Sequence, residues 1–128
     1  MATRPGTRGE AVAAFTRAVI KLEKEYLGRG PEDARTFFVE DLIIVRLRGI
    51  LTPAEQELAK SDSGRELVKE SRRRLFDTAR VREQIADFTR AIIGCEIVSL
   101  HTDVSTRTGE RLIVLTVDHD LDASFQDR

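Results

Sequence analysis

The sequence predicts a small α+β domain: a four-stranded, mostly antiparallel sheet made of two β-hairpins, with helices packed on one face. Amphipathic helical stripes alternate with short runs rich in Val, Ile, Leu and Thr. Each pair of β-rich runs follows a helical stripe that ends at glycine, and the 128 residues have the length of one domain. The expected order is therefore helix, hairpin, helices, hairpin.

The first helix is expected over residues 9–27, where apolar side chains recur at steps of three and four residues. A segment rich in Gly and Pro then ends it. Two β-prone runs follow, residues 35–39 and 42–47, and the acidic dipeptide between them predicts a tight hairpin. The second run alternates between an apolar face and a face that becomes basic at Arg46 and Arg48.

The segment 52–55, TPAE, predicts a helix start. Its threonine suits the cap, its proline suits the first helical position, and its glutamate stands three residues after the cap. A short helix to about residue 60 should follow. After an interruption at residues 62–64, one long helix is expected over residues 65–93, with Gly94 as its C-terminal stop.

The second hairpin is expected within residues 95–120, where two β-rich runs flank a polar turn. Residues 9–120 then form the single domain. The unpatterned residues 1–8 are expected to be a flexible leader, and the polar residues 121–128 a frayed tail.

Composition narrows the function classes. The 21 Lys and Arg against 22 Asp and Glu give a net charge of −1, which argues against a protein held to nucleic acid by overall charge. The single cysteine, Cys95, suits a reducing cytoplasm. The N-terminus lacks the apolar stretch of a signal peptide, and no apolar run has the length of a membrane-spanning helix. We therefore expect a cytoplasmic protein that reaches a membrane only through a partner or a surface patch.

Strand alternation places His101 and Asp103 on one face of the sheet. An aspartate orients a histidine for acid–base chemistry or metal binding, although a plain hydrogen-bonded pair is the commoner outcome. No second pair of residues with zinc-ligand spacing accompanies them, so no metal and no cofactor is predicted.

Residues 105–111 form the second candidate, because hydroxyls and backbone N–H groups of a turn hold anions, or else satisfy the turn itself. Two arginines in an apolar strand form the third, either as anion ligands or as members of cross-strand ion pairs. No catalytic residue is assigned. The candidate ligand-binding residues are Arg46, Arg48, His101, Asp103, Ser105, Thr108 and Arg111.

An arginine-rich stretch of the long helix allows contact with nucleic acid or anionic lipid. Acidic residues interleave with its arginines, so a salt-bridged solvent face is favoured and nucleic-acid binding is not expected. Cys95 follows the glycine stop of that helix, where the helix dipole disfavours a thiolate, and a structural role is expected for it. The arginines concerned are Arg72, Arg73, Arg74, Arg80 and Arg82.

Four phrases of the sequence together resemble the MpsC-type family, a small bacterial family named after a sodium-translocating, membrane-potential-generating system. They are GRGPEDAR at 28–35, IIVRLRGILTPAE at 43–55, LAKSDSGRELVKESR at 58–72 and SLHTDVSTRTGER at 99–111. The resemblance spans residues 9–119. It implies a cytoplasmic accessory protein linked to sodium and bicarbonate transport, with no established catalytic residues to carry over.

The family pattern also falls on most of the candidate residues. The leading hypothesis is therefore a non-enzymatic accessory or regulatory protein that acts through protein contacts, membrane transport proteins among them, and through a small anion. The alternative is a small-anion-sensing protein or an enzyme that uses one polar sheet face. The positions covered by the pattern are Arg46, Gly49, Leu51, Thr52, His101, Asp103, Ser105, Thr108, Gly109, Glu110 and Arg111, of which Arg46, His101, Asp103 and Arg111 would form the polar face.

A homodimer is also expected. One layer of helices leaves one sheet face uncovered, and alternation places Leu42, Ile44 and Ile97 on that face beside its polar residues. Apolar area of this kind is normally buried, most often against a second copy. A single helix over residues 65–93 would also overhang so small a sheet and pack along its symmetry mate.

Overall fold

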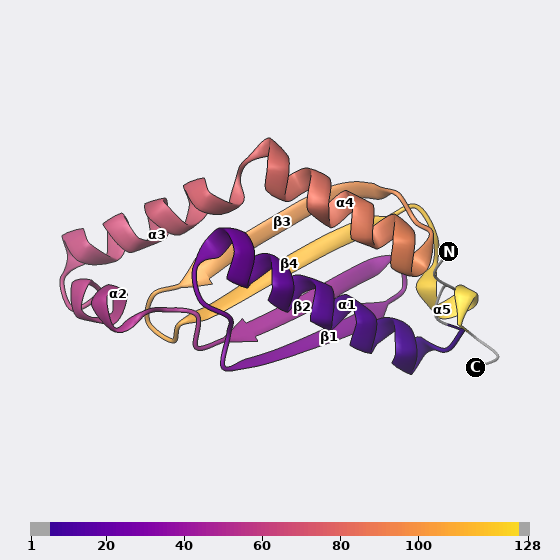
Figure 1. Ribbon diagram of the computed structural model, residues 1–128, viewed down its shortest axis with the longest axis horizontal. Helices are drawn as coiled ribbons and strands as arrows, with labels where there is room; N and C mark the ends of the chain where they lie inside the picture. The colour runs from indigo at the N-terminus through magenta and orange to yellow at the C-terminus, as the bar shows by residue number, and fades with distance from the viewer. Residues whose placement is uncertain (1–5, 126–128) are drawn as a thin grey trace.

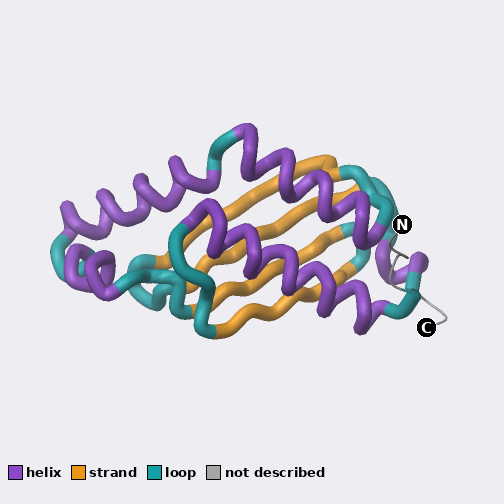
Figure 2. The backbone as a smooth tube through the Cα atoms, in the orientation of Figure 1, coloured by secondary structure: helices purple, strands orange, loops and turns teal. Residues whose placement is uncertain are grey.

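The computed structural model describes residues 6–125 and shows two layers, helices on one side and a sheet on the other (Figures 1 and 2). In chain order the elements are α1 (Arg8–Leu22), a π-helical turn η1 (Glu23–Leu27), β1 (Asp33–Val39), β2 (Leu42–Arg48), α2 (Pro53–Leu58), α3 (Asp62–Phe76), α4 (Ala79–Ile93), β3 (Ile97–Ser105), β4 (Glu110–Val117) and α5 (Leu121–Ser124).

The sheet has the strand order β1-β2-β4-β3, and every neighbouring pair is antiparallel. Helices α1 and α4 lie side by side across one face, whereas α3 runs on past the end of the sheet with α2 beside it (Figure 1). The predicted α+β class and the one-sided helical cover are confirmed. No helix of the described residues combines the length and apolarity needed to cross a membrane.

The core lies between the sheet and the two covering helices. The ring of Phe15 on α1 meets the rings of Phe38 and Phe88 edge to face, with centroids 6.4 and 5.1 Å apart. The strand side chains that point toward the helices are fully buried, which removes their apolar surface from water. They include Ile43, Val45, Leu47, Ile113, Leu115 and Val117, packed against Val19, Leu22, Val81 and Ile85.

Side-chain caps start the helices where the sequence allows them. Thr7 and Thr52 each form a reciprocal capping box with the glutamate three residues later, so the predicted start at TPAE is confirmed. The predicted hairpin of residues 35–47 is also confirmed. Glu40, at φ 57°, makes its two-residue turn, and each strand extends slightly beyond the predicted bounds.

The expectation of one long helix over residues 65–93 is wrong. The chain leaves the helix at Asp77 and Thr78, and the Thr78 hydroxyl accepts from the N–H of Val81 at 3.2 Å to start α4. Helix α3 also begins earlier than expected, at Asp62, with Ser61 as its cap. The argument for a dimer from one overhanging helix therefore fails.

A β-bulge in β3 corrects the predicted face of one residue. Ile97 pairs with Val117 and Ser99 pairs with Thr116, so one extra residue, Val98, stands between them. This shift turns Ile97 toward the helix side, where it packs against the core instead of sharing a face with His101.

The ends of the described chain contact each other. Within the expected leader, Arg8 donates to the carbonyl of Phe38 at 2.9 Å and pairs with Asp122 at 2.8 Å. Within the expected tail, Leu121–Ser124 form α5, and Leu121 is fully buried. Residues 1–5 and 126–128 lie outside the described residues.

Candidate functional site

The sheet face without helices, called the open face below, has an apolar centre and a charged margin. Phe37, Val39 and Leu112 on this face remain 39–45% exposed. The strand registers and the alternation along each strand define its members. They are Asp33, Arg35, Phe37 and Val39 on β1; Leu42, Ile44, Arg46 and Arg48 on β2; Glu110, Leu112, Val114 and Thr116 on β4; and Ser99, His101, Asp103 and Ser105 on β3.

Arg46 is occupied by a cross-strand ion pair. Its Nε lies 2.5 Å from Oε2 of Glu110, which faces it from β4. A groove of about 990 Å³ opens beside this pair, between the β3–β4 turn and the segment around α2. This arginine groove is lined by Arg46, Arg48, Arg65, Arg107, Glu32, Glu110 and the turn residues Thr106, Thr108 and Gly109, among others.

The hydroxyls of the β3–β4 turn satisfy the turn itself. Ser105 Oγ accepts from the N–H of Thr108 at 3.2 Å, and Thr108 Oγ1 accepts from the N–H of Glu110 at 3.3 Å. Gly109, at φ 75°, supplies the left-handed conformation that closes the turn. Both hydroxyl oxygens thus serve as acceptors within the turn, whereas the arginines beside them supply the positive charge that an anion needs.

His101 and Asp103 share the open face, as predicted, on the edge strand β3. Asp103 accepts from the N–H of Val104 at 2.9 Å, and it lies 3.4 Å from the ammonium of Lys69 on α3. Within the described part of the chain, no hydrogen bond or ion pair joins His101 to Asp103. The aspartate therefore does not orient the imidazole for acid–base work.

Arg111 does not lie on the open face. The prediction that it shares a polar sheet face with Arg46, His101 and Asp103 is therefore wrong for Arg111. Alternation along β4 turns it toward the helices, where only 1% of the residue is exposed. Its Nη1 donates to Thr102 Oγ1 at 3.1 Å, and its guanidinium lies over the ring of Phe76 with the centroid at 5.0 Å.

Glu23 is the buried counter-ion of Arg111. Its Oε1 lies 3.1 Å from Arg111 Nε, but neither oxygen of Glu23 makes an aligned hydrogen bond. Burial raises the pKa of Glu23, with Arg111 and Arg72 opposing the rise, and burial lowers the pKa of Arg111. Glu23 was not predicted as a functional or buried residue. Its position four residues after Val19, which is buried on α1, was the sequence signal that its side chain points inward.

Arg72 is likewise buried, although the sequence placed it in a solvent-exposed run. It forms a forked ion pair with Glu55 and donates to the carbonyls of Leu27 and Ile50. Its spacing of four residues from Val68 and Phe76, both buried on α3, was the signal that its side chain points inward.

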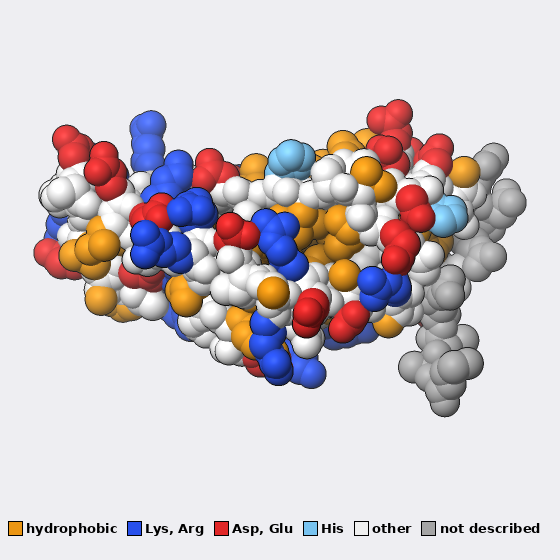
Figure 3. Space-filling view, turned by 90° about the horizontal axis from the view of Figure 1, so that it is seen from above, with side chains coloured by type: hydrophobic (Ala, Val, Ile, Leu, Met, Phe, Trp, Pro, Cys, Tyr) orange, Lys and Arg blue, Asp and Glu red, His pale blue; other side chains and the backbone are white. Residues whose placement is uncertain are grey.

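The other arginines of that run have polar partners. Arg73 and Arg74 pair with Glu70, and Arg82 pairs with Asp77, so a salt-bridged solvent face is confirmed for them. Arg80 donates to the hydroxyl of Tyr26. Figure 3 looks down on the β3 edge and the helices, and charged side chains of both signs are interspersed along this side.

The family model described as "Na+-translocating membrane potential-generating system (MpsC)" matches residues 7–119. The chain belongs to the MpsC family. Two proteins of Bacillus subtilis (strain 168) are similar to it. The uncharacterized protein YbcI is 36% identical over 120 residues, 94% of this chain and 95% of that protein. The uncharacterized protein YrhF is 31% identical over 108 residues, 84% and 88% of the two chains. No solved structure matches the chain.

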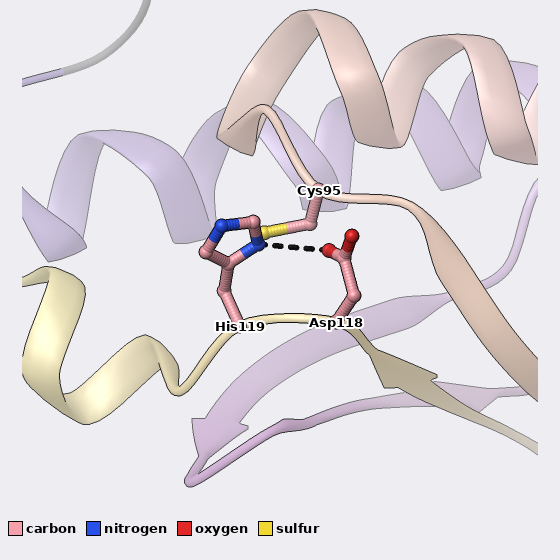
Figure 4. Close-up of side chains that lie close together, drawn as sticks. All are labelled: Cys95, Asp118 and His119. Carbon is pink, nitrogen blue, oxygen red and sulfur yellow. Dashed lines mark hydrogen bonds and ion pairs between the residues drawn. The ribbon is translucent and has the colours of Figure 1, made fainter.

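The region that matches the MpsC family contains every strand of the sheet and both buried ion pairs. It ends at His119, which lies next to Asp118 and close to Cys95 (Figure 4). Cys95 is buried, as a structural cysteine would be. The structure also places the imidazole of His119 close to it, a neighbour that the sequence did not reveal. This MpsC-family domain therefore groups charged side chains at three places: the open face with its groove, the buried pairs, and the end of β4.

Proposed function

We propose that this chain is a non-enzymatic accessory protein of a sodium-translocating system, linked to sodium and bicarbonate transport, and that it acts through protein contacts. The family supports the link to sodium translocation. The apolar centre of the open face carries the proposal of protein contacts. Side chains such as Phe37 and Leu112, exposed on a sheet face without helices, are normally covered by another protein surface.

The first partner on the open face is a second copy of the chain. The cross-strand registers order one row as Arg35, Arg46, Leu112 and Asp103, from the β1 edge to the β3 edge. The row is thus basic at one edge and acidic at the other.

A two-fold axis parallel to the strands, between β2 and β4, sets the β1 edge of one copy over the β3 edge of the other. Arg35 then faces Asp103 of the second copy, and the reverse pair forms at the other edge. Along the next row, Ile44 faces Val114 of the second copy. An axis perpendicular to the strands would set β1 over β1 and would give no such pairing, so the charges favour the parallel axis.

In this dimer, the helical layer and the projecting α2–α3 segment face outward, away from the interface. A membrane transport protein is the partner that we propose for these surfaces, and contact with it would hold the dimer at the membrane. The family's link to sodium translocation supports this assignment. The hydrogen bonds of Arg72 attach α2 and α3 to the rest of the domain, so the partner would meet them as one surface.

Cross-linking in the native cell, followed by recovery of a tagged chain, tests the accessory role. The wild-type protein should recover a subunit of a sodium-translocating system, and deletion of the chain should change how growth depends on sodium and bicarbonate. Leu67→Glu should reduce this recovery, because Leu67 is exposed on α3, within the surface assigned to the transport protein. Leu112→Glu, an equally charged change on the open face, should instead disrupt the dimer and so separates the two contacts. Recovery of no transport component together with unchanged growth would refute the accessory role.

A second candidate function is the binding of a small anion in the arginine groove. Four arginines line this groove against the two glutamates Glu32 and Glu110, and arginine forks suit oxyanions such as bicarbonate. Calorimetry with bicarbonate, against chloride at equal ionic strength, should show binding that the double variant Arg48→Ala/Arg107→Ala loses. Arg17→Ala, on exposed α1, is the matched control. Equal heats for both anions would count against this function.

A further inference from the structure

Three potential metal ligands meet where two connections of the chain come together. Cys95 lies between α4 and β3, and Asp118 and His119 follow β4 directly. One ligand atom of each lies within 4.8 Å of the other two, and His119 Nδ1 is 2.8 Å from Asp118 Oδ1. Figure 4 shows the three side chains directed toward one another, with the sulfur next to the ring nitrogen that contacts the carboxylate.

The position of the sulfur distinguishes a metal site from a catalytic triad. In a triad the nucleophile and the carboxylate use different nitrogens of the imidazole. Here the thiol of Cys95 and the carboxylate of Asp118 both lie on the Nδ1 side of His119 (Figure 4). Three donor atoms of different types that lie within 4.8 Å of one another suit a shared cation.

The donors and their surroundings fit a zinc-class ion. Thiolate sulfur, imidazole nitrogen and carboxylate oxygen are the three ligand types that Zn²⁺ takes in proteins. An open hollow of about 510 Å³ adjoins the cluster and leaves room for a water as fourth ligand. Acidic residues dominate this hollow, which favours a cation. Its lining within the described residues is Glu40, Asp41, Val117, Asp118, His119 and Asp120.

Backbone contacts hold the ligands in place. The N–H of Glu96 donates to Asp118 Oδ1 at 2.9 Å, and the N–H of Asp118 donates to the carbonyl of Glu96 at 3.1 Å. Asp118 Oδ1 thereby accepts from the N–H of Glu96 and contacts Nδ1 of His119, so the carboxylate is held between the two connections. Such outer contacts orient metal ligands before an ion binds.

We propose that Cys95, Asp118 and His119 form a binding site for a divalent transition-metal ion of the zinc class. Binding releases the proton of the Cys95 thiol to solvent, and the sulfur forms a bond with the ion, whose charge stabilises the thiolate. The ion would join the α4–β3 connection to the end of β4. This site is separate from the open face and does not rest on the proposed function.

Titration of the full chain with Co²⁺ tests the site. Since the chain has one cysteine, a thiolate-to-cobalt charge-transfer band reports Cys95 alone. The band should saturate at one ion per chain, and Zn²⁺ should abolish it. Cys95→Ser should remove the band, and His119→Ala should weaken Co²⁺ binding by about 10-fold or more. His101→Ala, which changes the other histidine on the distant open face, should bind Co²⁺ like the wild type.

Absence of the band from the wild type would overturn the proposal. An equal loss of binding in His101→Ala and His119→Ala would overturn it as well, because only His119 belongs to the cluster. Circular dichroism checks that each variant keeps its helices. If Cys95→Ser unfolds, His119→Ala still decides the outcome, since this histidine side chain is 58% exposed and its loss leaves the core intact. Zn²⁺ should also raise the Tm of the wild type but not that of His119→Ala.

Discussion

Arg72 and Glu55 face each other through two parallel hydrogen bonds, from Nε to Oε2 at 2.8 Å and from Nη2 to Oε1 at 2.5 Å. The same guanidinium donates to the carbonyl of Leu27 at 2.7 Å and to that of Ile50 at 2.8 Å. One side chain on α3 thereby fixes the end of η1, the segment after β2 and the first turn of α2. Arg72 is 2% exposed, so these bonds form away from water.

Arg72→Met should lower the free energy of unfolding by about 3–5 kcal/mol, because it leaves a carboxylate and two carbonyls without their donor. Urea unfolding at fixed protein concentration measures the loss. Arg74→Met on the same helix is the control. Arg74 is 77% exposed, and its solvent-screened pair with Glu70 should contribute far less to stability than the buried network. Similar losses in the two variants would show that the buried network does not stabilise the fold.

The buried pair of Glu23 and Arg111 should show strong coupling in a double-mutant cycle. Glu23→Met and Arg111→Met should each cost about 3–5 kcal/mol, because each leaves the opposite charge buried alone. The double variant should recover much of that loss, because it leaves no buried charge at this position. Additive losses would mean that the two side chains do not interact. Urea unfolding of all four proteins provides the comparison.

The pH dependence of stability should differ in sign between two glutamates. Burial works to raise the pKa of Glu55, but bonds from Arg72 and Thr52 outweigh it and hold that pKa below its ordinary value of 4.5. The stability that Glu55 contributes is therefore complete above pH 4.5 and is lost as pH falls through the folded-state pKa. Burial raises the pKa of Glu23, so its contribution instead decreases as pH rises from 4.5 through the folded-state value.

Glu55→Gln should therefore flatten the loss of stability toward acid pH, and Glu23→Gln should steepen it. The slope of the urea midpoint between neutral pH and about pH 4 is the readout, since both variants also lose stability at every pH. Identical slopes in the wild type and both variants would contradict the assigned shifts.

Two glycines in helices should respond oppositely to alanine. A Cβ at Gly64 would lie 1.7 Å from the carbonyl oxygen of Leu58, a backbone atom that cannot yield, so Gly64→Ala should destabilise the packing of α2 against α3. A Cβ at Gly9 meets nothing within 4 Å, so Gly9→Ala should stabilise α1 by about 0.5–1 kcal/mol. Thermal unfolding distinguishes the two, and equal Tm shifts would contradict the clash.

The proposed dimer predicts a mass near twice 14.4 kDa by light scattering at micromolar concentration. Ile44→Glu should give a folded monomer, with the helical signal retained, because Ile44 lies on the open face. If Ile44→Glu unfolds the chain, the side chain belongs to the core and the face assignment is reversed. A mass near 14.4 kDa for the wild type would refute the dimer.

A charge exchange tests the geometry of that dimer. Arg35→Glu and Asp103→Arg should each weaken association, because each sets like charges opposite one another across the interface. The double variant should restore dimerisation, since the two pairs re-form with exchanged signs. If the double variant fails to dimerise, the axis parallel to the strands is excluded. The light-scattering mass of the wild type would still show whether the chain dimerises in another way.

Local patterns determined the elements of this protein. The 3.6-residue spacing of apolar side chains predicted α1, the segment TPAE predicted the start of α2, and strand alternation placed His101 and Asp103 on one face of their strand. Each of these rests on residues that contact their own neighbours in the chain, and such contacts can be read from spacing. The family resemblance over the same residues is likewise a property of the sequence, and the comparison confirmed it.

The tertiary structure decided the rest. Arg72 and Arg111 are buried because their partners, Glu55 and Glu23, come from distant segments, and no local spacing reports a counter-ion 17 or more residues away. The break at Thr78 and the bulge beside Ile97 are seen only in the folded chain. The approach of Cys95 to Asp118 and His119 also depends on the tertiary fold, because the pairing of β3 with β4 brings these residues together. Local propensity selects the elements, whereas burial and charge pairing between distant segments select their faces and their partners.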